Sequence, residues 1–118
     1  MESDQFRGIM RQLATGVTVV TSRSGTDPVG MTVSAFNSVA VDPPLVLVCL
    51  TVGGATAMAV SATNKFTVNI LADDQAELSN RFAFTEQEQR FDELEWTWTE
   101  LGTPRLHGLL ATAMTAHP

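Results

Sequence analysis

Hydroxyl side chains alternate along one apolar segment, residues 30–38, and are the first groups in the sequence that could do chemistry. Thr32, Ser34 and Ser38 fall on alternate positions. In a strand they share one face of a sheet and can hydrogen-bond a polar ligand. Any half-exposed strand shows the same alternation, with its hydroxyls facing solvent. The spacing therefore leaves open a ligand-binding face and an ordinary polar face.

Motifs that carry a reaction by themselves are missing from the sequence. It contains no G-x-G-x-x-G, G-x-x-x-x-G-K-[ST], G-x-S-x-G or C-x-x-C pattern, so a Rossmann site, a P-loop, a hydrolase elbow and a thiol redox pair lack support. His107 and His117 have no carboxylate or cysteine at metal-ligand spacing, which favours structural or solvent roles. Cys49 lies in an apolar run, where a thiol packs as a small hydrophobe. We expect no catalytic side chain and no metal site.

Charge and composition exclude several classes of partner. Thirteen acidic and seven basic residues give a net charge of −6, which argues against a nucleic-acid or basic membrane-surface protein. No run approaches the roughly 20 apolar residues of a membrane span, and the acidic first residues are unlike a signal peptide. Cys49 is the only cysteine, so an intrachain disulfide is excluded. These features predict a cytoplasmic protein without a membrane partner.

The elements that must position the polar groups follow from hydrophobic periodicity. The 118 residues are 44% hydrophobic, enough for one domain over 1–118 to bury about two thirds of its unfolded surface. Rapidly succeeding strands favour a meander or a barrel, interrupted by two helices. We expect a helix in 1–14, strands in 17–21, 29–36, 38–41, 45–50 and 66–71, a helix in 55–62, a second helix capped by Asp73 or Asp74, and an edge strand in 96–99.

Acidic residues concentrate in one stretch, residues 73–100. It holds nine of the acidic residues and two of the basic ones. Because carboxylates beside a bound anion raise the free-energy cost of binding it, we expect this stretch to be a solvated excursion away from any anionic ligand.

The order of motifs resembles the flavin reductase-like family, the split-barrel proteins that serve as reductase components of two-component flavin monooxygenases. The resemblance covers nearly the whole chain. The matching segments are Phe6-Arg7, 14–21, 28–36, Ser38-Val39, 42–49, 66–72, Gln75, Leu78-Ser79, 81–83, 102–104 and 106–108.

This resemblance implies a mainly β fold with short helices, a six-stranded Greek-key split β-barrel of the FMN-binding type. It also implies a homodimer with FMN, or FAD, in a groove between the barrel and its partner, and NADH or NADPH as co-substrate. The segment 30–35 would run beside the flavin ring, and the loop after Cys49 would receive the phosphate. The cofactor-binding residues implied are Gly30, Met31, Thr32, Val33, Ser34, Ala35, Cys49, Leu50, Thr51, Gly53, Gly54, Ala55, Thr56, Leu71, Ala72, Arg81 and Phe82.

The loop 51–56 agrees physically with that role, although a plain Gly-Gly turn is the alternative. Gly53 and Gly54 let a ligand approach the backbone closely, and amides at the start of a helix attract anions. Two departures from the family accompany this agreement. There is no cation between Arg23 and Lys65, so we expect weak phosphate binding. Residues 111–118 lose the aliphatic pattern of a strand, so we expect the family's last strands, with a Gly-Asp-His segment near the nicotinamide, to be absent.

Three functions remain open at this point. The leading hypothesis is an NAD(P)H:flavin oxidoreductase that transfers hydride to FMN, FAD or riboflavin and supplies reduced flavin to a monooxygenase. Because the cofactor carries that chemistry, an enzyme of this kind needs no acid-base pair of its own. The alternatives are a flavin-binding or structural dimer without turnover, and a relative that binds haem or a deazaflavin.

Overall fold

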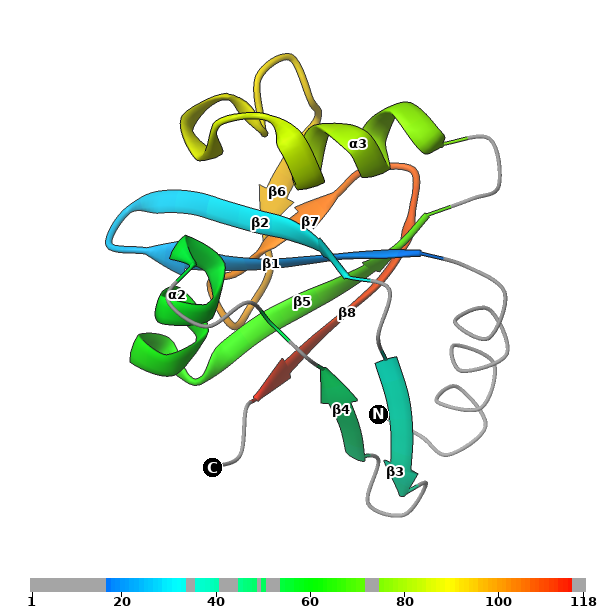
Figure 1. Cartoon of the computed structure of the whole chain (residues 1–118). Coiled ribbons are helices and arrows are strands. Elements are labelled where there is room, and N and C mark those ends of the chain that lie inside the picture. Colours follow the sequence, from blue (N-terminus) through cyan, green and yellow to red (C-terminus); the bar gives the residue numbers. More distant parts are fainter. Residues whose placement is uncertain are drawn as a thin grey trace.

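The computed structural model describes residues 17–33, 36–40, 45–48, 50, 54–71 and 75–115. Its centre is an antiparallel four-stranded sheet with the order β2-β1-β5-β8 (Figure 1). The strands of this sheet are β1 (Thr18–Ser24), β2 (Asp27–Val33), β5 (Lys65–Ile70) and β8 (Leu110–Thr115).

Strands β1 and β2 form the hairpin that the turn-forming residues 22–28 predicted. The two strands pair from Thr18 opposite Val33 to Ser24 opposite Asp27. Gly25 makes the turn with φ +63°, a left-handed backbone conformation that glycine adopts without steric cost. The β-branched run at the start of β1 is buried, as expected for a central strand.

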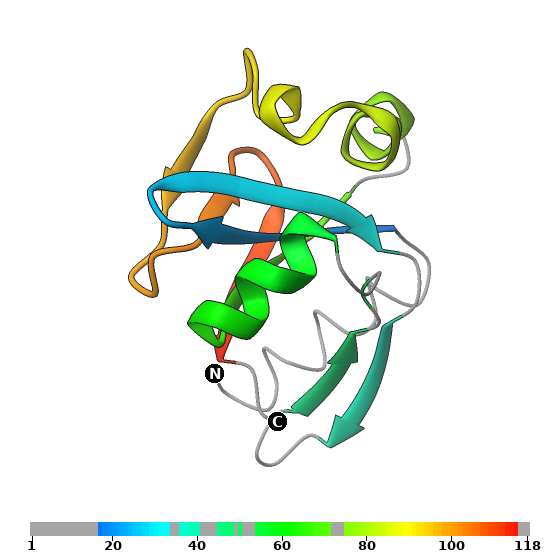
Figure 2. The same cartoon turned by 60° about the vertical axis from the view of Figure 1, so that its left-hand side comes forward.

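Two smaller hairpins complete the strands of the described residues. They are β3 (Phe36–Ala40) with β4 (Leu45–Val48), and β6 (Trp96–Trp98) with β7 (Pro104–Leu106). The β3–β4 pair stands apart from the main sheet in both views (Figures 1 and 2). The described part of the chain thus holds eight strands in three sheets, where the resemblance implied six strands. Strand β6 confirms the strand expected over 96–99.

In the described residues, two α-helices and one short 3-10 helix interrupt the strands. They are α2 (Ala55–Thr63), α3 (Ala76–Phe84) and η1 (Gln87–Gln89). The N-cap residue of α3 is Gln75, and Asp73 and Asp74, which were expected to cap this helix, lie outside the described residues. The helix expected over 1–14 lies outside the described residues. Among the helices that the structure describes, none has the length and apolar character needed to cross a membrane.

Alternation along β1 creates a core on each face of the main sheet. Val20 belongs to a cluster with Phe66 and Val68, against which α2 packs through Val60. Its neighbour Val19 belongs to a second cluster, which α3 covers. Adjacent strand residues point to opposite faces, so α2 and α3 lie on different sides of β1 and β2 (Figure 2). The members of the second cluster are Val19, Leu71, Phe82, Leu106 and Leu109.

Strand β8 corrects the expectation for the C-terminal residues. Residues 110–115 pair in register with β5, from Ile70 opposite Leu110 to Lys65 opposite Thr115. Met114 packs against the first core cluster. The expected loss of strand character is therefore wrong for 111–115, because backbone pairing with β5 provides the hydrogen bonds that a weak side-chain pattern cannot predict.

Buried polar side chains fasten the β6–β7 hairpin to the main sheet. Asn69 is fully buried; its Nδ2 donates to the Val19 carbonyl at 3.0 Å and its Oδ1 accepts the Leu106 N–H at 2.9 Å. Thr21 donates its hydroxyl to the Pro104 carbonyl at 2.5 Å. Buried polar groups that are satisfied in this way specify one arrangement of the elements. The network therefore fixes the position of the β6–β7 hairpin on the main sheet.

Candidate functional site

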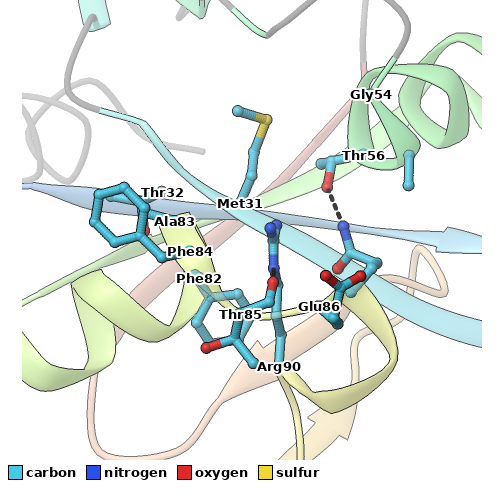
Figure 3. Close-up of a pocket in the computed structure, with 12 residues that line it drawn as sticks. Met31, Thr32, Gly54, Thr56, Phe82, Ala83, Phe84, Thr85, Glu86 and Arg90 are labelled. Carbon is cyan, nitrogen blue, oxygen red and sulfur yellow. Dashed lines mark hydrogen bonds between the residues drawn. The ribbon is translucent and has the colours of Figure 1, made fainter.

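A cavity of about 490 Å³ lies where β2, the start of α2 and the segment after α3 meet (Figure 3). Its volume falls within the roughly 300–1,000 Å³ of small-molecule sites. Residues from three separate parts of the sequence line it: Met31, Thr32, Gly54, Ala55, Thr56, Phe82, Ala83, Phe84, Thr85, Glu86, Gln87 and Arg90.

The backbone of Gly30 in β2 bonds two residues that line this cavity, Gln87 and Arg90. Its N–H donates to Oε1 of Gln87 at 3.0 Å, and its carbonyl accepts from Nη1 of Arg90 at 2.8 Å. Strand β2 is an edge of the main sheet, and edge strands expose unpaired backbone groups. Two side chains of the acidic stretch therefore occupy part of this edge and hold that stretch against the sheet.

Arg90 brings a positive charge to the cavity. Its Nε donates to the Thr85 carbonyl at 2.8 Å, which fixes the guanidinium in the wall. Burial lowers the pKa of Arg90 below its usual value, and the carboxylate of Glu86 counteracts that shift in part. An arginine stays protonated in proteins, so the charge is present at neutral pH. The bonds to Thr85 and Gly30 use Nε and Nη1, and Nη2 takes part in neither of these bonds between described residues.

The start of α2 faces the cavity with backbone donors. Gly54 is its N-cap and provides no side-chain hydrogen bond to the first turn. The N–H groups of a first helical turn have no partner within the helix, and the helix dipole adds partial positive charge there. Thr56 is buried, and its hydroxyl lies 3.5 Å from Nε2 of Gln87. An anion in this cavity would meet both the helix terminus and Arg90.

Two phenylalanines line the cavity, one of them buried and the other exposed. Phe82 is fully buried and makes an edge-to-face contact with Phe91 at 5.1 Å between ring centroids. Phe84 has 84% of its surface exposed and lies at the margin of the cavity (Figure 3). An exposed ring at a cavity margin can stack on a planar ligand.

One segment of the acidic stretch, residues 85–90, reaches the candidate site. Thr85, Glu86, Gln87 and Arg90 line the cavity. That the carboxylates of the stretch lie away from the phosphate of a bound flavin stays a prediction. Sequence reasoning missed Gln87 and Arg90, because each bonds a residue 57 or 60 positions away. A basic residue within an otherwise acidic stretch was the only signal that pointed to Arg90.

The structure places the predicted binding residues in several surroundings. Val33 and Leu71 are buried in the two core clusters, and Leu50 packs against the first of them. Arg81 is not among the lining residues of the cavity and donates to the Asp92 carbonyl at 2.6 Å. The hydroxyl of Thr32 donates to the Ser79 carbonyl at 2.5 Å, which ties α3 to β2. Met31, Thr32, Gly54, Ala55, Thr56 and Phe82 line the cavity, whereas Ser34, Ala35, Cys49, Thr51, Gly53 and Ala72 lie outside the described residues.

His107 lies in the β7–β8 region and not among the residues of the cavity. Its Nδ1 is 3.9 Å from Oε2 of Glu95, and its Nε2 is 3.3 Å from the Thr97 hydroxyl. Within the part of the chain that the structure describes, no three His, Cys, Asp or Glu side chains gather closely enough to hold a metal ion. His117 lies outside that part.

Replacing Gly30 by alanine is expected to destabilise the protein by about 1–3 kcal/mol, the usual cost of overpacking. The added Cβ would lie 2.9 Å from Cε1 of Phe82 and 3.0 Å from Cγ2 of Thr21. Urea unfolding measures the loss. The double variant Gly30→Ala/Phe82→Leu removes the contacting ring atom and should lose less than the sum of its single variants. Additive losses would show that Gly30 and Phe82 do not contact each other in this way.

Comparison with known proteins places this geometry in a family. Residues 10–115 match the flavin reductase like domain. The chain is 40% identical over 109 residues to an FMN reductase (NADH) from Agrobacterium fabrum, covering 92% of this chain and 62% of that protein. It is 37% identical over 106 residues to the reductase subunit of a flavin-dependent monooxygenase from Mycobacterium tuberculosis, covering 90% of this chain and 56% of that subunit. The chain thus spans little more than half the length of these relatives.

A solved structure agrees with the sequence match. Nitrilotriacetate monooxygenase component B from Mycobacterium thermoresistibile superposes with a TM-score of 0.81 at 31% identity, covering 98% of this chain and 67% of that one. The expected fold class, mainly β with short helices in the manner of the flavin reductase split barrel, is confirmed by this likeness. Sequence and structure together establish that the chain belongs to the flavin reductase like domain family.

Proposed function

We propose that this chain binds FMN in the cavity beside β2 and acts as the flavin-binding part of an NAD(P)H-dependent flavin reductase. The observation that carries the proposal is the meeting of Arg90 and the start of α2 in one cavity that also has an exposed aromatic ring. A phosphate and a planar ring system are the two ends of FMN, and this cavity offers a partner to each.

The residues of the cavity fit the chemistry of FMN. The guanidinium of Arg90 can donate a charge-assisted hydrogen bond to a phosphate oxygen through Nη2. The amides at the start of α2 add uncharged donors, and Gly54 and Ala55 bring no side chain larger than a methyl group to the cavity wall. Met31 and Phe84 offer apolar and aromatic surface to the ring. The remaining predicted contacts, among them Ser34, Ala35, Cys49, Thr51, Gly53 and Ala72, stay part of the proposal.

The protein's own contribution to the reaction is to bind and orient. When bound, flavin supplies an atom that accepts hydride from a nicotinamide. Arg90, fixed by Thr85 and Gly30, would hold the phosphate end, and Met31 and Phe84 would offer apolar surface to the ring. Because the flavin would carry the chemistry of hydride transfer, the protein needs no acid-base pair of its own.

The relatives support a role as the reductase component of a two-component monooxygenase. The protein from M. tuberculosis is described as the reductase subunit of a flavin-dependent monooxygenase, and the protein from A. fabrum as an FMN reductase (NADH). We extend both to this chain as proposals, together with a homodimer, one domain over 1–118 and a cytoplasmic location. A flavin-binding or structural dimer without turnover is the second candidate, because the chain spans little more than half of those relatives.

Flavin titration followed by NADH consumption tests the proposal. We expect the purified chain to quench FMN fluorescence to saturation, and the complex to consume NADH with added FMN faster than free FMN does. FMN binding without NADH consumption would favour the second candidate. Saturation with haem or a deazaflavin in place of FMN, riboflavin and FAD would contradict the proposal.

Light scattering should give about twice the chain mass, and a monodisperse monomer would contradict the homodimer.

A further inference from the structure

The cavity wall carries two opposite charges on one short segment. Glu86 and Arg90 both line the cavity, and they are the charged members of the described set that does so. They lie on either side of η1 in the same wall (Figure 3). Against the larger lowering by burial, the Glu86 carboxylate also acts to raise the pKa of Arg90, as expected for opposite charges that lie near each other. Any phosphate held by Arg90 would therefore also lie in the field of Glu86.

The position of Glu86 is fixed by the local backbone. Glu86 is the N-cap of η1, and its carbonyl accepts the Gln89 N–H at 2.9 Å. The next residue, Gln87, bonds the Gly30 N–H, and Arg90 bonds the Gly30 carbonyl. Gln87 and Arg90 follow Glu86 in the same segment and hold this segment against β2. Glu86 therefore lines the cavity although its side chain is exposed.

We propose that Glu86 is a specificity-determining residue that weakens the binding of phosphorylated flavins and leaves the binding of the flavin ring unchanged. The inference rests on the proposed function, because it assumes that flavin occupies the cavity. Arg90 contributes one positive charge, Glu86 one negative charge, and the phosphate of FMN close to two negative charges at neutral pH. Glu86 offsets the attraction that Arg90 provides, so flavin is bound without being retained. That property suits a reductase whose product must leave for another protein.

The test removes the charge of each of two carboxylates in turn and measures the binding of two flavins. Glu86→Gln keeps the size and polarity of the side chain and removes its charge. Glu88→Gln is the matched control, because Glu88 is an exposed residue of the same 3-10 helix and does not line the cavity. FMN and riboflavin share the ring and differ in the phosphate. Dissociation constants for both flavins come from fluorescence titration of the oxidised ligand, so turnover is not needed.

We expect Glu86→Gln to lower the dissociation constant of FMN by about three- to tenfold at low salt, from charge interactions across a partly solvated site. The constant for riboflavin should change less than twofold, and Glu88→Gln should change neither by more than twofold. The gain for FMN should shrink as ionic strength rises.

Three results would overturn the inference while leaving the proposed function intact. They are unchanged or weaker FMN binding by Glu86→Gln, an equal gain for riboflavin, and an equal gain from Glu88→Gln. The last would show that overall charge, and not the position of Glu86, sets affinity. Binding of neither flavin by the unchanged chain would instead overturn the proposed function and this inference together.

Discussion

Replacing Arg90 by glutamine is expected to weaken FMN binding by about 10- to 100-fold. A hydrogen bond to a charged group contributes about 1.5–3 kcal/mol, and each 1.4 kcal/mol is a factor of about ten in affinity. The variant also loses the bonds to the carbonyls of Thr85 and Gly30, so the cavity wall becomes less well fixed. Fluorescence titration with FMN and riboflavin separates the two effects, because only FMN carries the phosphate. Riboflavin affinity should fall by no more than a few-fold.

Two further variants serve as controls for Arg90. Arg90→Lys keeps the charge but not the planar fork, so its FMN affinity should lie between those of the unchanged chain and Arg90→Gln. Arg81→Gln removes a charge from α3 whose guanidinium points to the Asp92 carbonyl, and it should leave FMN affinity within twofold. A loss of FMN affinity from Arg81→Gln as large as that from Arg90→Gln would mean that Arg81 contacts the phosphate. The family resemblance implied Arg81 as a cofactor-binding residue.

Replacing Phe82 by alanine is expected to cost about 3–5 kcal/mol of unfolding free energy, the usual loss for a buried phenylalanine. Phe82 is fully buried in the second core cluster, lines the cavity and lies against Gly30. A domain of this size has about 5–15 kcal/mol of stability in total, so the variant should be much closer to unfolding at room temperature. Urea denaturation followed by circular dichroism measures the change.

Phe84→Ala is the matched control for this loss. Phe84 lies two residues further along α3 and has 84% of its surface exposed, so its removal should change stability by less than about 0.5 kcal/mol. Its effect should be seen in flavin affinity instead, through lost stacking. A loss below 1 kcal/mol for Phe82→Ala would show that the cavity floor is not part of the packed core.

Local sequence patterns predicted most of the regular elements. The β-branched run of β1 and the turn formers around Gly25 predicted the first hairpin, and the alternation at 66–71 predicted β5. The helix expected over 55–62 is present as α2. These predictions succeeded because turn geometry and strand propensity act between neighbours in sequence.

The same patterns failed where the cause is distant in sequence. Strand β8 owes its form to pairing with β5, about 45 residues earlier, and its own side chains, mostly Ala and Thr, predict little. The order of motifs along the chain did indicate the family, which the comparisons then established.

By itself the sequence determined the fold class, the absence of a self-sufficient catalytic motif, and the strand and loop that meet at the cavity. Only the tertiary structure decided what completes that cavity. Gln87 and Arg90 belong to a stretch whose charge predicts distance from an anion, yet hydrogen bonds to the backbone of Gly30 bring them into the wall. The physical reason is that net charge describes a segment as a whole, whereas binding depends on single groups whose positions are set by hydrogen bonds at short range.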